Sequence, residues 1–296
     1  MSHVAFGTPR KLPRANALAG RVAVLDIAFA AEGTGTSFEK VTGTFLKNLG
    51  GRLAVWVDHH DHPLHAQFKG DPRFVLATKA EHGACPEMID PALVRRVGPV
   101  DTIVCHTDFD GLCSAAKWLR EGREPYPGAD ADARAIDTRI GTPSERADMV
   151  DRALRVEGRD EGFLAEVVRW LADGAEDGDL ARHIADVSRA WDAVERGTRE
   201  LAAARYRVEG EVAWCDVGDT PPRSFDKTEL LLLGQQRARV SMVLDTHNVT
   251  LAAPFDSGID FLTLLGVQGG MPTRVSVPRQ REPEVREALR AKGLLP

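Results

Sequence analysis

Three apolar segments of the chain each end in side chains that can bind a divalent metal ion. In chain order these side chains are Asp26 after VAVL, Asp58, His59 and His60 after AVWV, and His106, Asp108 and Asp110 after TIVC. Functional groups of an open parallel sheet collect at the carboxyl ends of its strands, so we expect these side chains to converge. Several carboxylates in one cleft repel one another unless cations lie among them. The pattern therefore predicts a metal site.

The donor set also indicates which ion and which reaction to expect. Mixed imidazole and carboxylate ligation suits Mn²⁺ or a similar divalent ion, with Mg²⁺ and Co²⁺ as alternatives. The number of ligands favours two ions over one. Two ions about 3.5–4 Å apart commonly stabilise both the attacking and the leaving oxygen of a phosphoryl displacement. We therefore predict hydrolysis of a phosphomonoester or phosphodiester by an activated water.

The segments that carry these residues indicate an α/β fold. Strand, loop and helix patterns repeat from Arg21, from Arg52 and from Val100. Such alternation is typical of right-handed crossovers and a mainly parallel sheet. We also expect a further strand over residues 131–138, ADARAIDT.

The remaining sequence predicts a helical connector and a second domain. An acidic stretch from Met149 to Leu201 has only helical patterns, and four strand-like runs with helices between them follow Arg205. We expect a tail over residues 1–20, a catalytic domain with its helical connector over 21–204, and a smaller α+β substrate-binding domain over 205–296.

Composition limits the partners. The chain of 296 residues has 38 Lys and Arg against 44 Asp and Glu, a net charge of −6, which argues against a basic sheath for duplex nucleic acid. A polyanionic ligand must then be held locally, by metal or by a basic patch. The four cysteines form no C-x-x-C pair, and we find no signal-peptide pattern and no apolar run of membrane-spanning length. We expect a cytoplasmic protein.

Two motifs carry a family resemblance. DHH at 58–60 and HTDFDG at 106–111, each after an apolar segment, resemble the signature motifs of the DHH phosphoesterase superfamily. That superfamily includes RecJ-type exonucleases, oligoribonucleotide and cyclic-dinucleotide phosphodiesterases, and family II pyrophosphatases. The last domain looks like a DHHA1 substrate-binding domain, with GVQGGMP near its end. The resemblance implies a manganese-dependent phosphoesterase.

The resemblance also implies roles for individual residues. The implied metal ligands are Asp26, His59, His106, Asp108, Asp110 and Asp177, the last within WLADGAEDG. Asp26 would bridge the two ions and His60 would face the substrate phosphate. Asp58 would lie behind an imidazole and fix its tautomer. Asp137, in AIDTR, is an alternative to Asp177.

The chain departs from the family pattern in two ways. Its motifs run in the order Asp26, DHH, HTDFDG, whereas the family has the DxD motif first, and this order resembles a circular permutation. The family's terminal Gly-Gly-His is replaced by Gly269-Gly270-Met271. We expect Gly269, Gly270 and Arg274 to bind phosphate instead. Short single-stranded oligonucleotides or small nucleotides are the expected substrates, and a catalytically silent nucleotide-binding protein is the alternative.

Overall fold

The computed structural model describes residues 2–31, 36–222, 224–267 and 271–296. The chain forms two compact units, Met1–Ala190 and Trp191–Pro296. Among the described helices, none is both long enough and apolar enough to cross a bilayer.

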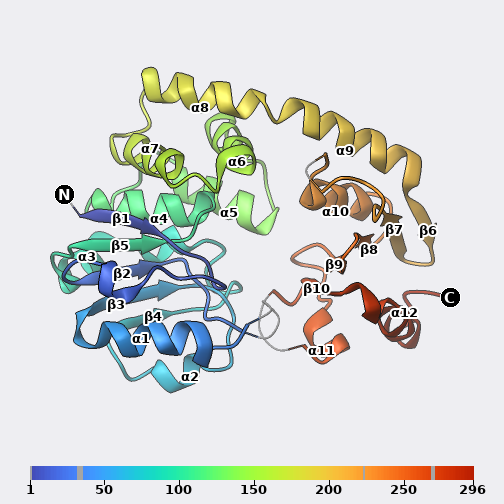
Figure 1. Ribbon diagram of the computed structural model, residues 1–296, viewed down its shortest axis with the longest axis horizontal. Helices are drawn as coiled ribbons and strands as arrows, with labels where there is room; N and C mark the ends of the chain where they lie inside the picture. The colour runs from blue at the N-terminus through green and yellow to red at the C-terminus, as the bar shows by residue number, and fades with distance from the viewer. Residues whose placement is uncertain (1, 32–35, 223, 268–270) are drawn as a thin grey trace. The chain divides into compact units, whose positions relative to one another are not determined.

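The first unit is built on a five-stranded sheet in the order β1-β5-β2-β3-β4, and every strand pair in it is parallel (Figure 1). The strands are β1 (His3–Phe6), β2 (Val22–Leu25), β3 (Leu53–Asp58), β4 (Phe74–Leu76) and β5 (Thr102–Cys105). The three central strands are the apolar segments that carry the candidate ligands. Because parallel strands end at the same edge, the sheet brings those ligands together.

Apolar side chains cover both faces of this sheet. Ala23, Val55 and Ile103 lie in one buried cluster, while the alternate residues Val24 and Trp56 lie in another. This period of two is that of a strand, and burial of both faces is typical of parallel sheets. Figure 1 shows α4 and α7 over one face and α1 over the other.

In the first unit, the first three α-helices alternate with strands, and the other five follow β5 without a further strand. They are α1 (Thr44–Leu49), α2 (His65–Phe68), α3 (Pro91–Val97), α4 (Phe109–Leu119), α5 (Ala129–Thr138), α6 (Glu145–Glu157), α7 (Glu161–Ala172) and α8 (Asp179–Arg189), with the short helical turns η1 (Ala15–Ala17), η3 (Glu39–Gly43), η4 (Gly50–Arg52) and η5 (Cys85–Met88).

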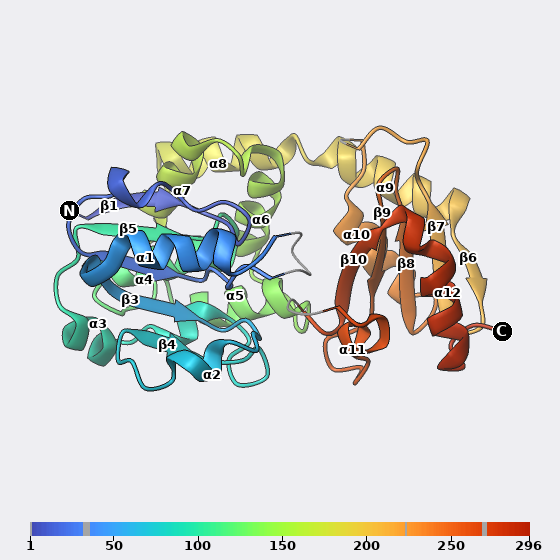
Figure 2. The same ribbon diagram turned by 60° about the horizontal axis from the view of Figure 1, so that its bottom comes forward.

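The second unit contains a mixed sheet in the order β10-β9-β8-β7-β6, in which β7 and β8 are parallel and the other pairs are antiparallel (Figure 2). Its elements are α9 (Asp192–Arg205), β6 (Arg207–Glu209), β7 (Val212–Asp216), α10 (Lys227–Gln235), β8 (Val240–Leu244), β9 (Asn248–Ala252), α11 (Phe261–Leu265), β10 (Arg274–Pro278), η6 (Arg279–Arg281) and α12 (Glu282–Ala291). Two apolar clusters cover its faces, one with α9 and α10 and one with α11 and α12.

The α/β fold class is confirmed, and three local features differ from expectation. Residues 131–138 lie in α5 and form no strand, because Ala129, Ala133 and Ile136 repeat at helical spacing on a buried face. The expected N-terminal tail contains β1, whose four residues are too few to show a periodic pattern in the sequence. Helix α9 packs within the second unit, so the units divide between Ala190 and Trp191.

Candidate metal centre

Asp26 follows β2 in an uncommon backbone conformation. Its φ is 59°, in the left-handed region that non-glycine residues rarely adopt. The Asp26 N–H donates to the carbonyl of Val57 at 2.9 Å, which ties this turn to β3. Such conformations cost energy and occur often at functional sites. The carboxylate is only 1% exposed, and neither oxygen has a hydrogen-bond partner among the described residues.

The first cluster of ligand atoms joins Asp26 to His106 and Asp108. His106 Nδ1 lies 2.7 Å from Asp108 Oδ2 and 4.0 Å from Asp26 Oδ2. Asp108 also caps α4, because its Oδ1 accepts the N–H of Gly111 at 3.0 Å. Position 111 must be glycine, since a Cβ there would lie 2.6 Å from the His106 carbonyl oxygen. The glycine of the HTDFDG motif thus lets the first turn of α4 pack closely against the backbone of His106.

The second cluster joins His59 to three carboxylates. His59 Nε2 lies 3.3 Å from Asp26 Oδ1, 3.3 Å from Asp110 Oδ2 and 3.8 Å from Asp137 Oδ2. The other ring nitrogen, Nδ1, donates to the His82 carbonyl at 2.9 Å. A carbonyl can only accept, so this bond keeps the proton on Nδ1 and turns Nε2 toward the carboxylates.

Two carboxylates of the second cluster are held from outside it. Asp110, in the first turn of α4, accepts the N–H of Cys85 at 3.0 Å. Asp137, near the end of α5, accepts a hydrogen bond from the buried ammonium of Lys79. Lys79 plays no part in the sequence predictions. The signal that could have found it is the short strand β4, because Lys79 follows that strand at the carboxyl edge of the sheet.

The electrostatics show that the cluster requires positive charge. Burial, together with Asp110 and Asp108, raises the pKa of Asp26 well above its ordinary value. Burial alone would lower the pKa of His59, but Asp110 and Asp26 raise it to about 12. His106 behaves similarly: burial opposes its charge, and Asp108 and Asp26 raise its pKa to about 9. The buried carboxylates therefore favour positive charge at both imidazoles.

The residues present fit a divalent ion. Three buried ligand atoms lack a hydrogen-bond partner among the described residues, namely both Asp26 oxygens and His59 Nε2. Such unpaired groups are costly unless a partner occupies the space between them. Imidazole and carboxylate donors form a set typical of Mn²⁺ and related ions. The oxygens of Asp26 face one cluster each, so this carboxylate is placed to serve both.

Beside the clusters, the buried Asp58 pairs with the partly exposed His60. His60 Nδ1 lies 2.7 Å from Asp58 Oδ1, and the His60 side chain is 27% exposed while that of Asp58 is fully buried. Burial would raise the pKa of Asp58, but His60 lowers it below its ordinary value. The Asp58 carboxylate therefore accepts a hydrogen bond from His60 and keeps the proton on His60 Nδ1. His60 Nδ1 is also 4.0 Å from Asp26 Oδ1.

The structure brings most of the predicted site residues together. Those that meet at the sheet edge are Asp26, Asp58, His59, His60, His106, Asp108 and Asp110. Asp177 is exposed between α7 and α8 and belongs to none of the three ligand groups found among the described residues, whereas Asp137 belongs to one. Asp177 lies in an acidic segment between two helices, where water solvates its carboxylate.

The residues predicted to bind phosphate fall in another part of the chain. Arg274 begins β10 in the second unit, where its guanidinium donates to Thr228 Oγ1 at 3.1 Å. Gly269 and Gly270 lie outside the described residues.

No protein-family model matches the chain, and no curated protein matches it. Among solved structures, the chain is similar to exonuclease RecJ bound to manganese, with a TM-score of 0.46 and 14% identity over 92% of this chain and 74% of that chain. It is also similar to PggH, a pGpG-specific phosphodiesterase from Vibrio cholerae, with a TM-score of 0.44 and 11% identity over 93% of this chain and 98% of that chain.

Proposed function

We propose that the protein hydrolyses phosphodiester or phosphomonoester bonds in short single-stranded oligonucleotides or small nucleotides, with two Mn²⁺ ions at the metal centre. One observation carries this proposal. The buried Asp26 carboxylate has no hydrogen-bond partner among the described residues, and it directs one oxygen toward His59, at 3.3 Å, and the other toward His106, at 4.0 Å. A carboxylate shared by two clusters is the arrangement that a two-ion site needs.

The proposal assigns ligands to each ion. Asp26, His106 and Asp108 would hold one ion, and Asp26, His59, Asp110 and Asp137 would hold the other. Asp137 takes the place proposed earlier for Asp177, because only Asp137 approaches His59. When bound, the ions would activate a water molecule and neutralise charge on the phosphoryl group. Lys79 would hold Asp137 in position through their hydrogen bond.

His60 would contact the substrate. With Nδ1 held by Asp58, the ring presents Nε2 to a phosphate oxygen or to the leaving oxygen. Its partial exposure lets substrate reach it, whereas Asp58 is buried and acts only through the imidazole. The pair resembles the carboxylate and imidazole pairs that orient a proton donor.

A panel of substrates tests this function. Purified protein is incubated with short RNA and DNA strands, linear dinucleotides, mononucleotides, an aryl phosphodiester and a carboxylate ester, each with Mn²⁺ or with a chelator. The proposal expects metal-dependent release of nucleotides, and hydrolysis only of the carboxylate ester would contradict it.

The alternative, a catalytically silent nucleotide-binding protein, is favoured by Met271, which stands where the resemblance implies a histidine. It predicts nucleotide binding, with Mn²⁺ present, but turnover of none of these substrates.

A further inference from the structure

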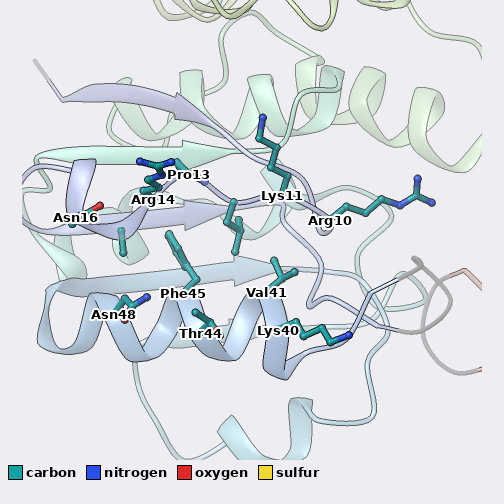
Figure 3. A pocket seen from close by; sticks show the side chains of 12 residues that line it. Arg10, Lys11, Pro13, Arg14, Asn16, Lys40, Val41, Thr44, Phe45 and Asn48 are labelled. Atoms are coloured by element: carbon teal, nitrogen blue, oxygen red, sulfur yellow. The ribbon is translucent and has the colours of Figure 1, made fainter.

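A cavity of the first unit lies apart from the metal centre. It is about 610 Å³ in volume, and its walls come from residues 10–16, between β1 and β2, and from residues 40–48 of η3 and α1 (Figure 3). None of the candidate metal ligands lines it. The proposed reaction at the metal centre leaves this cavity without a role.

The rim of the cavity is strongly basic. Arg10, Lys11, Arg14 and Lys40 line it and are exposed, and its lining includes no Asp or Glu among the described residues. This charge stands out because the whole chain carries a net charge of −6. Arginine and lysine are the side chains that bind phosphate groups most readily, and a field of one sign concentrates anions near it.

The floor of the cavity is apolar. Phe45 and Ala15 are buried beneath it, and Leu12, Pro13 and Val41 are partly buried around them. Amide and hydroxyl groups of Asn16, Thr44 and Asn48 complete the lining. An apolar floor with a few polar groups is typical of sites for organic ligands, and a bare phosphate would gain nothing from it. A nucleotide matches both parts, with phosphates at the rim and base or sugar on the floor.

The cavity runs along the sheet toward the edge that carries the metal ligands. In Figure 3, Arg10 and Lys40 lie near the tips of the strand arrows, and Arg14, Asn16 and Asn48 lie toward the opposite end. Asp26 and His59 follow those same strand ends. A strand of nucleic acid with one phosphate at the metal centre could therefore continue past Arg10 and Lys40 into the cavity.

We propose that this cavity binds nucleotides of a single-stranded oligonucleotide beyond the bond that is cleaved; its place on the substrate path rests on the proposed function. The site selects substrates several nucleotides long over isolated dinucleotides. Phosphate contacts of this kind make binding salt-dependent, with a slope in log K against log salt of about −0.7 for each contact on a single strand.

The test measures binding without hydrolysis. Fluorescence anisotropy with an end-labelled single strand of about 12 nucleotides, in chelator, compares wild type with Lys11→Glu/Lys40→Glu. The control, Lys47→Glu/Arg95→Glu, makes the same change in net charge at two exposed residues that do not line the cavity. Circular dichroism and melting temperatures establish that all three proteins are folded.

We expect the cavity variant to bind at least tenfold more weakly than wild type, and its salt slope to be shallower by roughly 1.4, for two lost contacts. The control variant should stay within about threefold of wild type, a loss that allows for its altered long-range field. Equal losses in both variants, or none in either, would overturn the proposal. As competitors, inorganic tripolyphosphate and an unlabelled oligonucleotide distinguish phosphate from nucleotide recognition, and equal displacement by both would refute the nucleotide assignment.

This experiment also separates the two proposals. Binding in chelator does not depend on turnover, so a failure of hydrolysis would leave the cavity result standing. Hydrolysis with no effect of the cavity variant on binding would refute the cavity and leave the proposed function intact.

Discussion

Replacing Asp26 by Asn tests whether one carboxylate serves two metal ions. The substitution keeps the volume of the side chain and removes its charge. Asp26 faces both clusters, whereas Asp108 belongs only to the cluster with His106 and Asp137 only to the cluster with His59. Loss of the Asp26 carboxylate should therefore weaken the binding of both ions. Asp108→Asn or Asp137→Asn should weaken the binding of one ion only.

The expected size follows from linkage. An ion that binds only the folded protein stabilises it by about 2.7 kcal/mol at a hundredfold excess over its dissociation constant. For a unit the length of Met1–Ala190, 1 kcal/mol shifts the melting temperature by about 2–4 °C, so each ion should add roughly 5–10 °C. Wild type should gain two such increments on addition of Mn²⁺, each single-cluster variant one, and Asp26→Asn none.

Without metal, the same substitution should act in the opposite direction. Burial and the neighbouring carboxylates Asp110 and Asp108 raise the pKa of Asp26, so its ionised form destabilises the metal-free fold at neutral pH. Chelated Asp26→Asn should melt higher than chelated wild type.

The assay combines differential scanning calorimetry with metal analysis after gel filtration. Asp26→Asn protein that retained two metal equivalents, or that gained as much stability from Mn²⁺ as wild type, would refute the shared-carboxylate reasoning.

Three further predictions concern the imidazoles and the second unit. Asp58→Asn should leave metal content near that of wild type and lower turnover by at least tenfold, because the amide no longer holds His60 in one tautomer; loss of a metal equivalent would make the pair part of the metal site. Chelated wild type should lose stability as the pH rises from about 6.5 to about 9, because the raised pKa of His106 favours the folded state below this window and the benefit is lost through it. Thermal melts should show a smaller loss in this window for chelated His106→Asn, in which only the contribution of His59 remains, and an equal loss in both proteins would refute the assignment to His106. Arg274→Ala should lower kcat/KM about tenfold to a hundredfold on a substrate with a second phosphate and much less on an aryl phosphodiester, because a charge-assisted contact is worth roughly 1.5–3 kcal/mol; equal effects on both substrates would exclude phosphate recognition by this arginine.

The structure bears on which arginine of the second unit is available to bind a substrate phosphate. Arg279 pairs with Asp216 at 2.7 Å, and Arg281 pairs with Glu284. Both guanidinium groups are engaged within the unit by carboxylates, and the guanidinium of Arg274 donates to the hydroxyl of Thr228. Substitution begins with Arg274 because it lies three residues after Met271, the position where the resemblance implies a histidine.

The residues of the site that follow strands could be predicted from the sequence. Asp26, His59 and Asp108 lie within three residues of the ends of apolar runs, and parallel strands bring their ends to one edge whatever the chain order. The same reasoning predicts the three central strands of the parallel sheet, because β2, β3 and β5 are continuous apolar segments.

The remaining parts of the site depend on tertiary packing. Asp137 lies near the end of a helix and reaches His59 only because α5 packs beside α4. Lys79 follows β4, a strand of three partly buried residues that gives almost no periodic signal. Asp177 shares its segment with Asp173, Glu176 and Asp179, and sequence alone does not show which acidic side chain turns toward a site and which stays in water.

The most direct test of the central claim is anomalous diffraction at the manganese edge from crystals grown with Mn²⁺. Two peaks about 3.5–4 Å apart, with Asp26 between them and with His106 and His59 on opposite ions, are the predicted result. A single peak, or peaks that Asp26 does not contact, would contradict the account.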